Sequence, residues 1–256
     1  MSRGDAVTTP LFDYALRLAD DALLLGHRLS EWCGQAPTLE EDLALANIGL
    51  DLIGQARSLY AYAGEVEGRG RDEDRLAYLR QDREYRNLLL VELPNGDFAF
   101  TIVRQLLHAA FMVPFWERLQ ASQDETLAAI AAKSLKEVRY HLRHAAEWVI
   151  RLGDGTEESR RRTEAALDEL WPWTGELFEQ DAAERALVEA GIAVDRVALR
   201  PAWDATVDEV LAEATLARPP DGWMQTGGRR GLHTEHLGYL LAELQHLQRS
   251  HPGATW

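Results

Sequence analysis

The sequence predicts an all-α protein built on an up-and-down bundle of four long helices. Over four long segments, apolar residues recur every three or four positions. The segments that connect them are short, and alternation of apolar and polar residues never persists long enough to indicate a strand. The chain has 256 residues, of which 46% are hydrophobic, which suffices for a sizeable core. We expect a single domain over residues 1–256, with the core bundle at about 11–152 and additional C-terminal helices at about 157–250.

The first two helices are expected at Leu11–Trp32 and Thr38–Tyr62. In the first helix, successive apolar residues are separated alternately by four and by three positions, which is the spacing of a helix that packs in a bundle. Thr38 is the predicted N-cap of the second, because three acidic residues follow it at the positive end of the helix. We expect the second helix to end before Gly64. Polar residues interrupt its apolar pattern and must be hydrogen-bonded inside the fold or face water: Asn47, Asp51, Gln55 and Ser58.

The second pair of helices follows a charged loop and a shorter helix expected at Glu73–Val91. Asp97 is the predicted N-cap of a helix at Phe98–Leu119, which we expect to bend at Pro114. The fourth helix is expected at Glu125–Leu152, with one continuous apolar stripe. Because short loops make consecutive helices antiparallel neighbours, the architecture expected is a four-helix bundle of the ferritin type.

Four further helical segments are expected after the bundle, at 157–178 with a break at Pro172, 182–190, 202–216 and 234–250. The loop Thr226–Gly231 precedes the last of them and contains two arginines. Such a loop either holds an anion with its backbone amides and arginines or is a simple connection. A cluster of His and Glu in the last segment, with Glu243-x-x-His246, is either a polar helix face or a metal site.

The composition limits the classes of partner. Acidic residues outnumber basic ones by 42 to 27, and the net charge of −15 repels phosphate backbones, so we expect no nucleic-acid partner. One cysteine, Cys33, permits no disulfide within the chain. The first ten residues lack the apolar segment of a signal peptide, and we expect no apolar run long enough for a membrane span, hence a cytoplasmic protein without membrane contact.

The expected bundle raises the question of a di-iron centre. Such a centre takes one Glu from each of two helices and Glu-x-x-His from each of the other two. The fourth helix offers Glu137, but Tyr140 stands where the histidine should be, and we expect His141, about 100° further round the helix, to point elsewhere. The second helix offers Asp51, but Gly54 supplies no ligand.

The first helix offers Asp20 and Asp21, whereas the third has no carboxylate between Asp97 and Glu117. These ligands are too few for a di-iron centre, and we expect neither metal nor catalytic residues in this chain. All basic residues are arginine except Lys133 and Lys136. One hypothesis is that a lysine enters the former metal cavity and replaces the charge of the metal; the alternative is that both lysines pair with surface acids. The candidates for the degenerate site are Asp20, Asp21, Asp51, Gly54, Lys133, Lys136, Glu137 and Tyr140.

Five stretches of the sequence resemble the ferritin-like structural subunit of bacterial phenylacetyl-CoA epoxidases: EWCGQAP (31–37), DLALANIGLDLIGQAR (42–57), NLLLVELPNG (87–96), KEVRYHLR (136–143) and GLHTEHLG (231–238). The resemblance spans nearly the whole chain. It implies a non-catalytic subunit of a multicomponent monooxygenase of phenylacetate degradation, with a degenerate metal site.

The resemblance also implies the partners. A homologous ferritin-like catalytic subunit would carry the di-iron centre and the CoA thioester, and a reductase would deliver electrons from NADPH. The implied reaction converts phenylacetyl-CoA with oxygen into the ring 1,2-epoxide. Two alternatives stay open from the residues: that this chain is itself a di-iron oxygenase, or that it is a metal-binding relative of ferritin.

Overall fold

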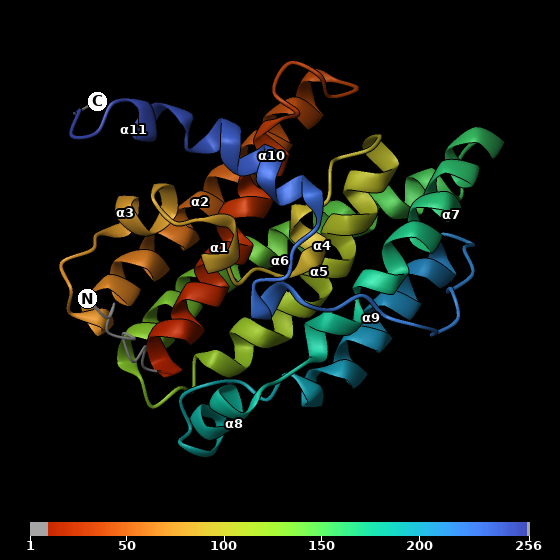
Figure 1. Cartoon of the computed structure of the whole chain (residues 1–256). Coiled ribbons are helices and arrows are strands. Elements are labelled where there is room, and N and C mark those ends of the chain that lie inside the picture. The colour runs from red at the N-terminus through yellow and green to blue at the C-terminus, as the bar shows by residue number, and fades with distance from the viewer. Residues whose placement is uncertain (1–9, 255–256) are drawn as a thin grey trace.

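Four long helices form the core of the computed structural model, which describes residues 10–254 (Figure 1). They are α1 (Pro10–Ser30), α2 (Leu39–Glu67), α5 (Phe98–Leu119) and α6 (Glu125–Gly153). The helices α1 and α2 pack as one antiparallel pair, α5 and α6 pack as a second, and α2 contacts α6. Within the described residues every regular element is helical, which confirms the all-α prediction.

Local capping sets the starts of the long helices. The Thr38 side chain accepts a hydrogen bond from Glu41 N at 3.4 Å, and Asp97 Oδ1 accepts one from Phe100 N at 2.9 Å, so both predicted N-caps are confirmed. The predicted end of α2 is wrong, because Gly64 does not stop the helix. A Cβ at Gly64 would lie 2.2 Å from the Arg71 carbonyl oxygen, so the glycine serves a close approach inside the helix.

The segment between the two helix pairs is not the single helix expected at Glu73–Val91. It contains α3 (Glu73–Tyr78), the 3₁₀ turn η1 (Asp82–Glu84) and α4 (Leu89–Glu92). Three backbone amides of this segment donate to buried carboxylates at 2.7–2.8 Å instead of to carbonyls of the preceding turn: those of Arg86, Leu88 and Leu89. Buried side-chain acceptors on other elements therefore replace the helical hydrogen bonds here.

The C-terminal third forms a second layer around the bundle. The helices α7 (Glu157–Leu170) and α9 (Arg200–Glu213) pack on α5 and α6, and α8 (Ala182–Glu189) contacts α1. Between them lie the 3₁₀ turns η2 (Trp171–Trp173), η3 (Gly175–Phe178) and η4 (Val197–Leu199). The predicted break at Pro172 is confirmed, because the α-helix ends at Leu170 and the chain continues in 3₁₀ turns to Phe178.

The last predicted helix is broken in two. The turn η5 (Gly228–Arg230) leads into α10 (Glu235–Leu244), and α11 (His246–Ser250) follows after Gln245. The Gln245 amide is buried at this junction and donates to the Arg80 carbonyl at 3.1 Å and to the Tyr85 hydroxyl at 3.0 Å. The break thus anchors the C-terminal helices to the segment that follows α3.

The helix α5 is the centre of the core. By length and composition it could cross a membrane, so the expectation that no apolar run reaches that length is wrong. Yet 83% of its most apolar stretch is buried inside the bundle. Its fully buried Arg104 donates to the Leu93 carbonyl oxygen at 2.6 Å. This pattern is that of a core helix enclosed by others.

Candidate functional site

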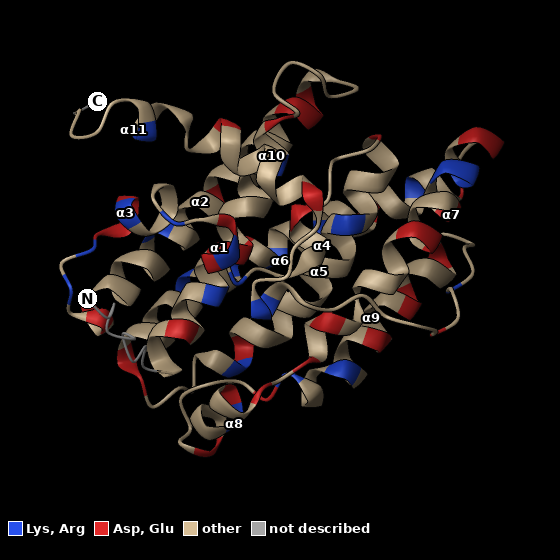
Figure 2. Ribbon diagram, in the orientation of Figure 1, with Lys and Arg blue, Asp and Glu red and all other residues tan. Residues whose placement is uncertain are grey.

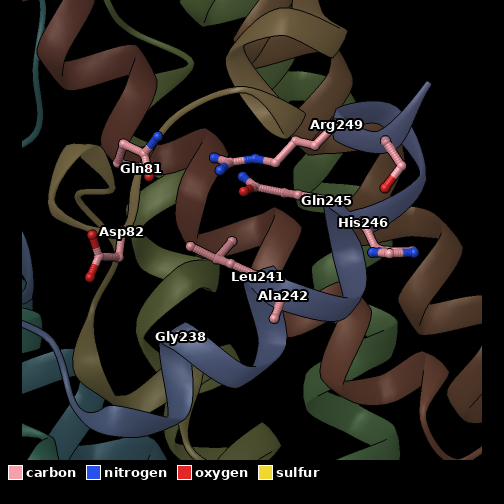
Figure 3. Close-up of a pocket in the computed structure, with 9 residues that line it drawn as sticks. Gln81, Asp82, Gly238, Leu241, Ala242, Gln245, His246 and Arg249 are labelled. Atoms are coloured by element: carbon pink, nitrogen blue, oxygen red, sulfur yellow. The ribbon is translucent and has the colours of Figure 1, made fainter. Parts of the chain in front are cut away.

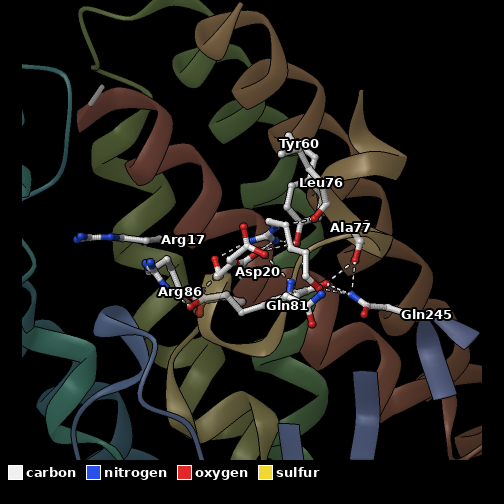
Figure 4. Close-up of polar contacts among 12 residues, drawn as sticks. Arg17, Asp20, Tyr60, Leu76, Ala77, Gln81, Arg86 and Gln245 are labelled. Carbon is white, nitrogen blue, oxygen red and sulfur yellow. Dashed lines mark hydrogen bonds and ion pairs between the residues drawn. The ribbon is translucent and has the colours of Figure 1, made fainter. Parts of the chain in front are cut away.

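Asp20 lies at the centre of α1 and is fully buried. Its carboxylate accepts hydrogen bonds from the Tyr60 hydroxyl at 2.5 Å, from Arg86 N at 2.7 Å and from two nitrogens of Arg80 (Figure 4). Burial, reinforced by the Asp20 charge, raises the pKa of Tyr60 well above its ordinary value. Burial lowers the pKa of Arg80, but the adjacent Asp20 more than offsets this and raises it. All the acceptor capacity of Asp20 is therefore used by a cation and two neutral donors.

Asp21, the next residue along α1, is held in the same way by a different segment. The Arg229 guanidinium donates to both of its oxygens at 3.1 and 2.6 Å, and Leu88 N donates at 2.7 Å. Burial lowers the pKa of Arg229, but the Asp21 charge overcomes that effect and raises it. The two adjacent carboxylates thus fix two separate segments onto the bundle, residues 80–88 and the loop that contains Arg229.

The loop Thr226–Gly231 does hold an anion, but that anion belongs to the chain itself. Gly227 N donates to Glu176 Oε1 at 3.0 Å, and Glu176 is buried. The arginine of this loop that points inward is Arg229, which is engaged by Asp21. The backbone amide and the guanidinium that suggested anion binding are therefore taken up by two internal carboxylates.

On α6, the inward-facing residue is His141 and not Tyr140. His141 is 2% exposed and its Nε2 lies 3.0 Å from Asp51 Oδ2, whereas Tyr140 is 39% exposed. The expectation that His141 points elsewhere is wrong. The reason is the helical register: the buried stripe of α6 passes through Val138, His141 and Ala145, three and four positions apart.

Glu137 lies at the seam between α6 and α2, where it accepts a hydrogen bond from Gln55 Nε2 at 2.9 Å. Lys133 Nζ is 3.9 Å from Glu137 Oε1, but the lysine side chain is 66% exposed, and Lys136 is exposed as well. The hypothesis that a lysine enters the former metal cavity is therefore wrong. Arg80 and Arg229 provide the positive charge for the interior carboxylates.

Gly54 faces outward, because a Cβ built there meets nothing within 4 Å. Asp51, three residues earlier, has 36% of its side chain exposed. The pair Asp51 and Gly54 therefore lies on the outer part of the seam and not at the centre of the bundle. The residue of α2 that faces the centre is Gln55, which is 3% exposed.

A cavity of about 10 Å³ lies between the four core helices. This volume is near the minimum that holds one water. Three buried atoms of its lining have no hydrogen-bond partner among the described residues: Gln105 Oε1, His108 Nε2 and Trp116 Nε1. Burial, with smaller contributions from the nearby His141 and Arg104, lowers the pKa of His108 to about 3. The imidazole of His108 is therefore neutral at physiological pH.

These residues do not fit a di-iron pair. Two hard iron ions need about four carboxylates with free oxygens. Here Asp20 and Asp21 are saturated by arginines, and Asp51 lies on the outer part of the seam. Within residues 10–254, no group of three or more His, Cys, Asp or Glu side chains is placed to hold a metal ion. The two adjacent carboxylates at the centre of α1 are instead held in fixed hydrogen bonds.

The C-terminal histidines serve the fold or face solvent. His233 Nδ1 lies 2.8 Å from Glu92 Oε2, and its Nε2 lies 3.1 Å from the Tyr85 carbonyl oxygen. His246 is exposed and lines an open hollow of about 390 Å³ together with Asp82 and Arg249 (Figure 3). The Glu243-x-x-His246 pair predicted as either a polar face or a metal site lies on the exposed side of α10 and α11.

Comparison with known proteins gives the family. The family model described as "Phenylacetic acid catabolic protein" matches residues 2–256. The chain is 55% identical over 243 residues to a protein of Escherichia coli (strain K12) that is named as a subunit of 1,2-phenylacetyl-CoA epoxidase. That alignment covers 95% of this chain and 98% of the relative.

Proposed function

Because the chain belongs to the phenylacetic acid catabolic protein family, we propose that it is a non-catalytic structural subunit of a multicomponent phenylacetyl-CoA 1,2-epoxidase. The name of the Escherichia coli relative, which aligns along nearly its whole length, supports a role as one subunit of such a complex. The complex would act in the cytoplasm, in aerobic breakdown of phenylacetate.

The observation that carries the non-catalytic role is the saturation of the interior carboxylates. Arg80 and Arg229 donate to both oxygens of Asp20 and of Asp21 respectively. Replacing an arginine by iron would leave a buried guanidinium unpaired, which is strongly unfavourable. The cofactor of the reaction is therefore expected in a partner: a homologous ferritin-like subunit that carries a di-iron centre. A reductase would be a further member of the complex.

The chain's own contribution in this proposal is a rigid scaffold. Each interior carboxylate binds a segment that is distant in sequence, so the bundle and its outer layer are held in one arrangement. Such a scaffold can support a homologous subunit without moving protons or electrons itself.

Iron analysis and reconstitution test the proposal together. The chain purified alone should contain no stoichiometric iron. Co-expression with the homologous di-iron subunit should give a complex on sizing, and epoxidation of phenylacetyl-CoA by that subunit and its reductase should fall when this chain is left out. Two irons per chain would instead favour the di-iron oxygenase, and assembly and activity that do not depend on this chain would contradict the scaffold role.

A further inference from the structure

The outer face of α2 carries an exposed apolar stripe. Leu39, Leu43 and Leu50 are 72%, 58% and 66% exposed, and their spacing of four and seven residues places them on one side of the helix. Soluble monomers rarely expose contiguous apolar surface of this kind. Ala46 lies on the same side between Leu43 and Leu50, and with the three leucines it forms what we call the leucine stripe, which ends at the exposed Arg57.

The outer face of α6 carries a basic row. Lys133, Lys136 and Arg143 are exposed, with Tyr140 between them, and the Arg143 guanidinium lies 5.4 Å from the centre of the Tyr140 ring. Their spacing of three or four residues places all four on one side of α6, and the exposed Glu147 ends the row. The chain as a whole has a charge of −15, and acidic residues are spread over α7, α8 and α9 (Figure 2). The basic row, which includes both lysines of the chain, is therefore a local positive region on a protein of net negative charge.

The seam between α2 and α6 separates the leucine stripe from the basic row. Three side-chain pairs bridge it: Glu41 with His144 at 2.7 Å, Asp51 with His141 at 3.0 Å and Gln55 with Glu137 at 2.9 Å. At about 100° per residue, these pairs lie roughly 140° round α2 from the leucine stripe and roughly 90° round α6 from the basic row. Both therefore face outward, one on each side of the seam, and we call this surface the α2–α6 face.

We propose that the α2–α6 face docks a partner protein that presents an apolar helical ridge bordered by Asp and Glu side chains. The leucine stripe supplies apolar surface that the partner can bury. The basic row favours a partner with acidic side chains beside its apolar ridge, and these charges fix how the two sets of helices align. The inference rests on the proposed function for its choice of partner, which is the homologous ferritin-like subunit. The surface itself follows from exposure and charge alone.

The test uses the purified full-length chain and the homologous di-iron subunit as the probe, with affinity measured by titration calorimetry. Leu43→Glu/Leu50→Glu should weaken binding by about 100-fold or more, because it places charge in the centre of the interface. Lys133→Glu/Lys136→Glu should weaken it by about 10-fold and remove most of its dependence on salt. All four side chains are exposed, so thermal unfolding should match that of the wild type.

Matched controls lie on other faces. Leu79 and Leu247 are 48% and 43% exposed, and Arg69 is exposed in the loop after α2. Leu79→Glu/Leu247→Glu and Arg69→Glu should bind like the wild type. If both face variants bound as tightly as the controls, the docking surface would be wrong while the proposed function stood.

Two other results separate the remaining outcomes. Absence of binding by the wild type would overturn the proposed function and, with it, this assignment of the partner. Sedimentation of the chain alone detects a second copy on the same face. If the wild type formed a dimer and the Leu43→Glu/Leu50→Glu variant did not, the assignment of this face to an acidic partner would be overturned.

Discussion

Asp20 on α1 and Asp51 on α2 are both carboxylates in the middle of bundle helices, but they lie in different surroundings. Asp20 is fully buried and is held by a guanidinium, a phenol and a backbone amide. The Asp51 side chain is 36% exposed, and its partner within hydrogen-bond distance is the imidazole of His141. A carboxylate removed from water needs a permanent cation and several donors, whereas one at the seam keeps part of its hydration.

This difference shows where the fold depends on charge. At the centre of α1, arginines from distant segments neutralise the acids, so the fold and the charge balance depend on each other. At the α2–α6 seam, the partners of the acids are an amide and two imidazoles, and Asp51 keeps part of its contact with water. The seam can therefore tolerate changes that the centre cannot, and four predictions test that contrast.

The largest effect is expected at Arg80. The variant Arg80→Met leaves the buried Asp20 without its cation and should lower the free energy of unfolding by about 3–5 kcal/mol in urea titrations. Adding Asp20→Asn should recover part of the loss, and the exposed Arg185→Met serves as the control. A loss below about 1 kcal/mol would show that the centre is no more dependent on charge than the seam.

The cavity beside the centre should make stability depend on pH. The pKa of His108 is about 3 in the folded protein, whereas an unperturbed histidine, as in the unfolded chain, has a pKa of 6.5. As the pH falls below 6.5, the His108 imidazole therefore becomes protonated in the unfolded chain but stays neutral in the folded protein. Between about pH 7.5 and pH 5 this group should lower the free energy of unfolding by about 2 kcal/mol.

The variant His108→Leu isolates that contribution. Between about pH 7.5 and pH 5, the free energy of unfolding of the variant should fall by ~2 kcal/mol less than that of the wild type. Urea titrations of both proteins at both pH values measure the difference. Equal pH dependence in the two proteins would show that His108 is not held neutral by the fold.

A smaller effect is expected at the seam. Asp51→Asn removes a charge that is partly hydrated and should change the free energy of unfolding by at most about 1 kcal/mol. The same urea titration measures it beside Arg80→Met. A loss as large as that of Arg80→Met would remove the contrast between the two regions.

The smallest effect on stability is expected at Lys133. Its ammonium group is 3.9 Å from Glu137 and its side chain is 66% exposed, so Lys133→Ala should change the free energy of unfolding by less than about 0.5 kcal/mol. A loss of several kcal/mol on thermal or urea unfolding would instead indicate a buried role for this lysine.

Local sequence patterns were enough to predict the four long helices, the caps Thr38 and Asp97 and the family. The apolar period and the capping side chain act within a few residues, and the family motifs are contiguous. The ligand rule for di-iron sites selected Asp20, Asp21, Asp51 and Glu137 as candidate acids, since each lies within one of the long helices.

Which acids lie inside, and what neutralises them, depends on contacts between distant parts of the chain. Arg80 and Arg229 reach the adjacent residues Asp20 and Asp21 from positions 60 and 208 residues away, which no local pattern encodes. On α6, the residue that faces the interior is His141 and not Tyr140, the position given by the ligand pattern. Each residue turns the helix by about 100°, so an error of one position exchanges a buried side chain for an exposed one. The irregular backbone at 79–88 has the same origin, because its amides bind carboxylates that only the fold brings near.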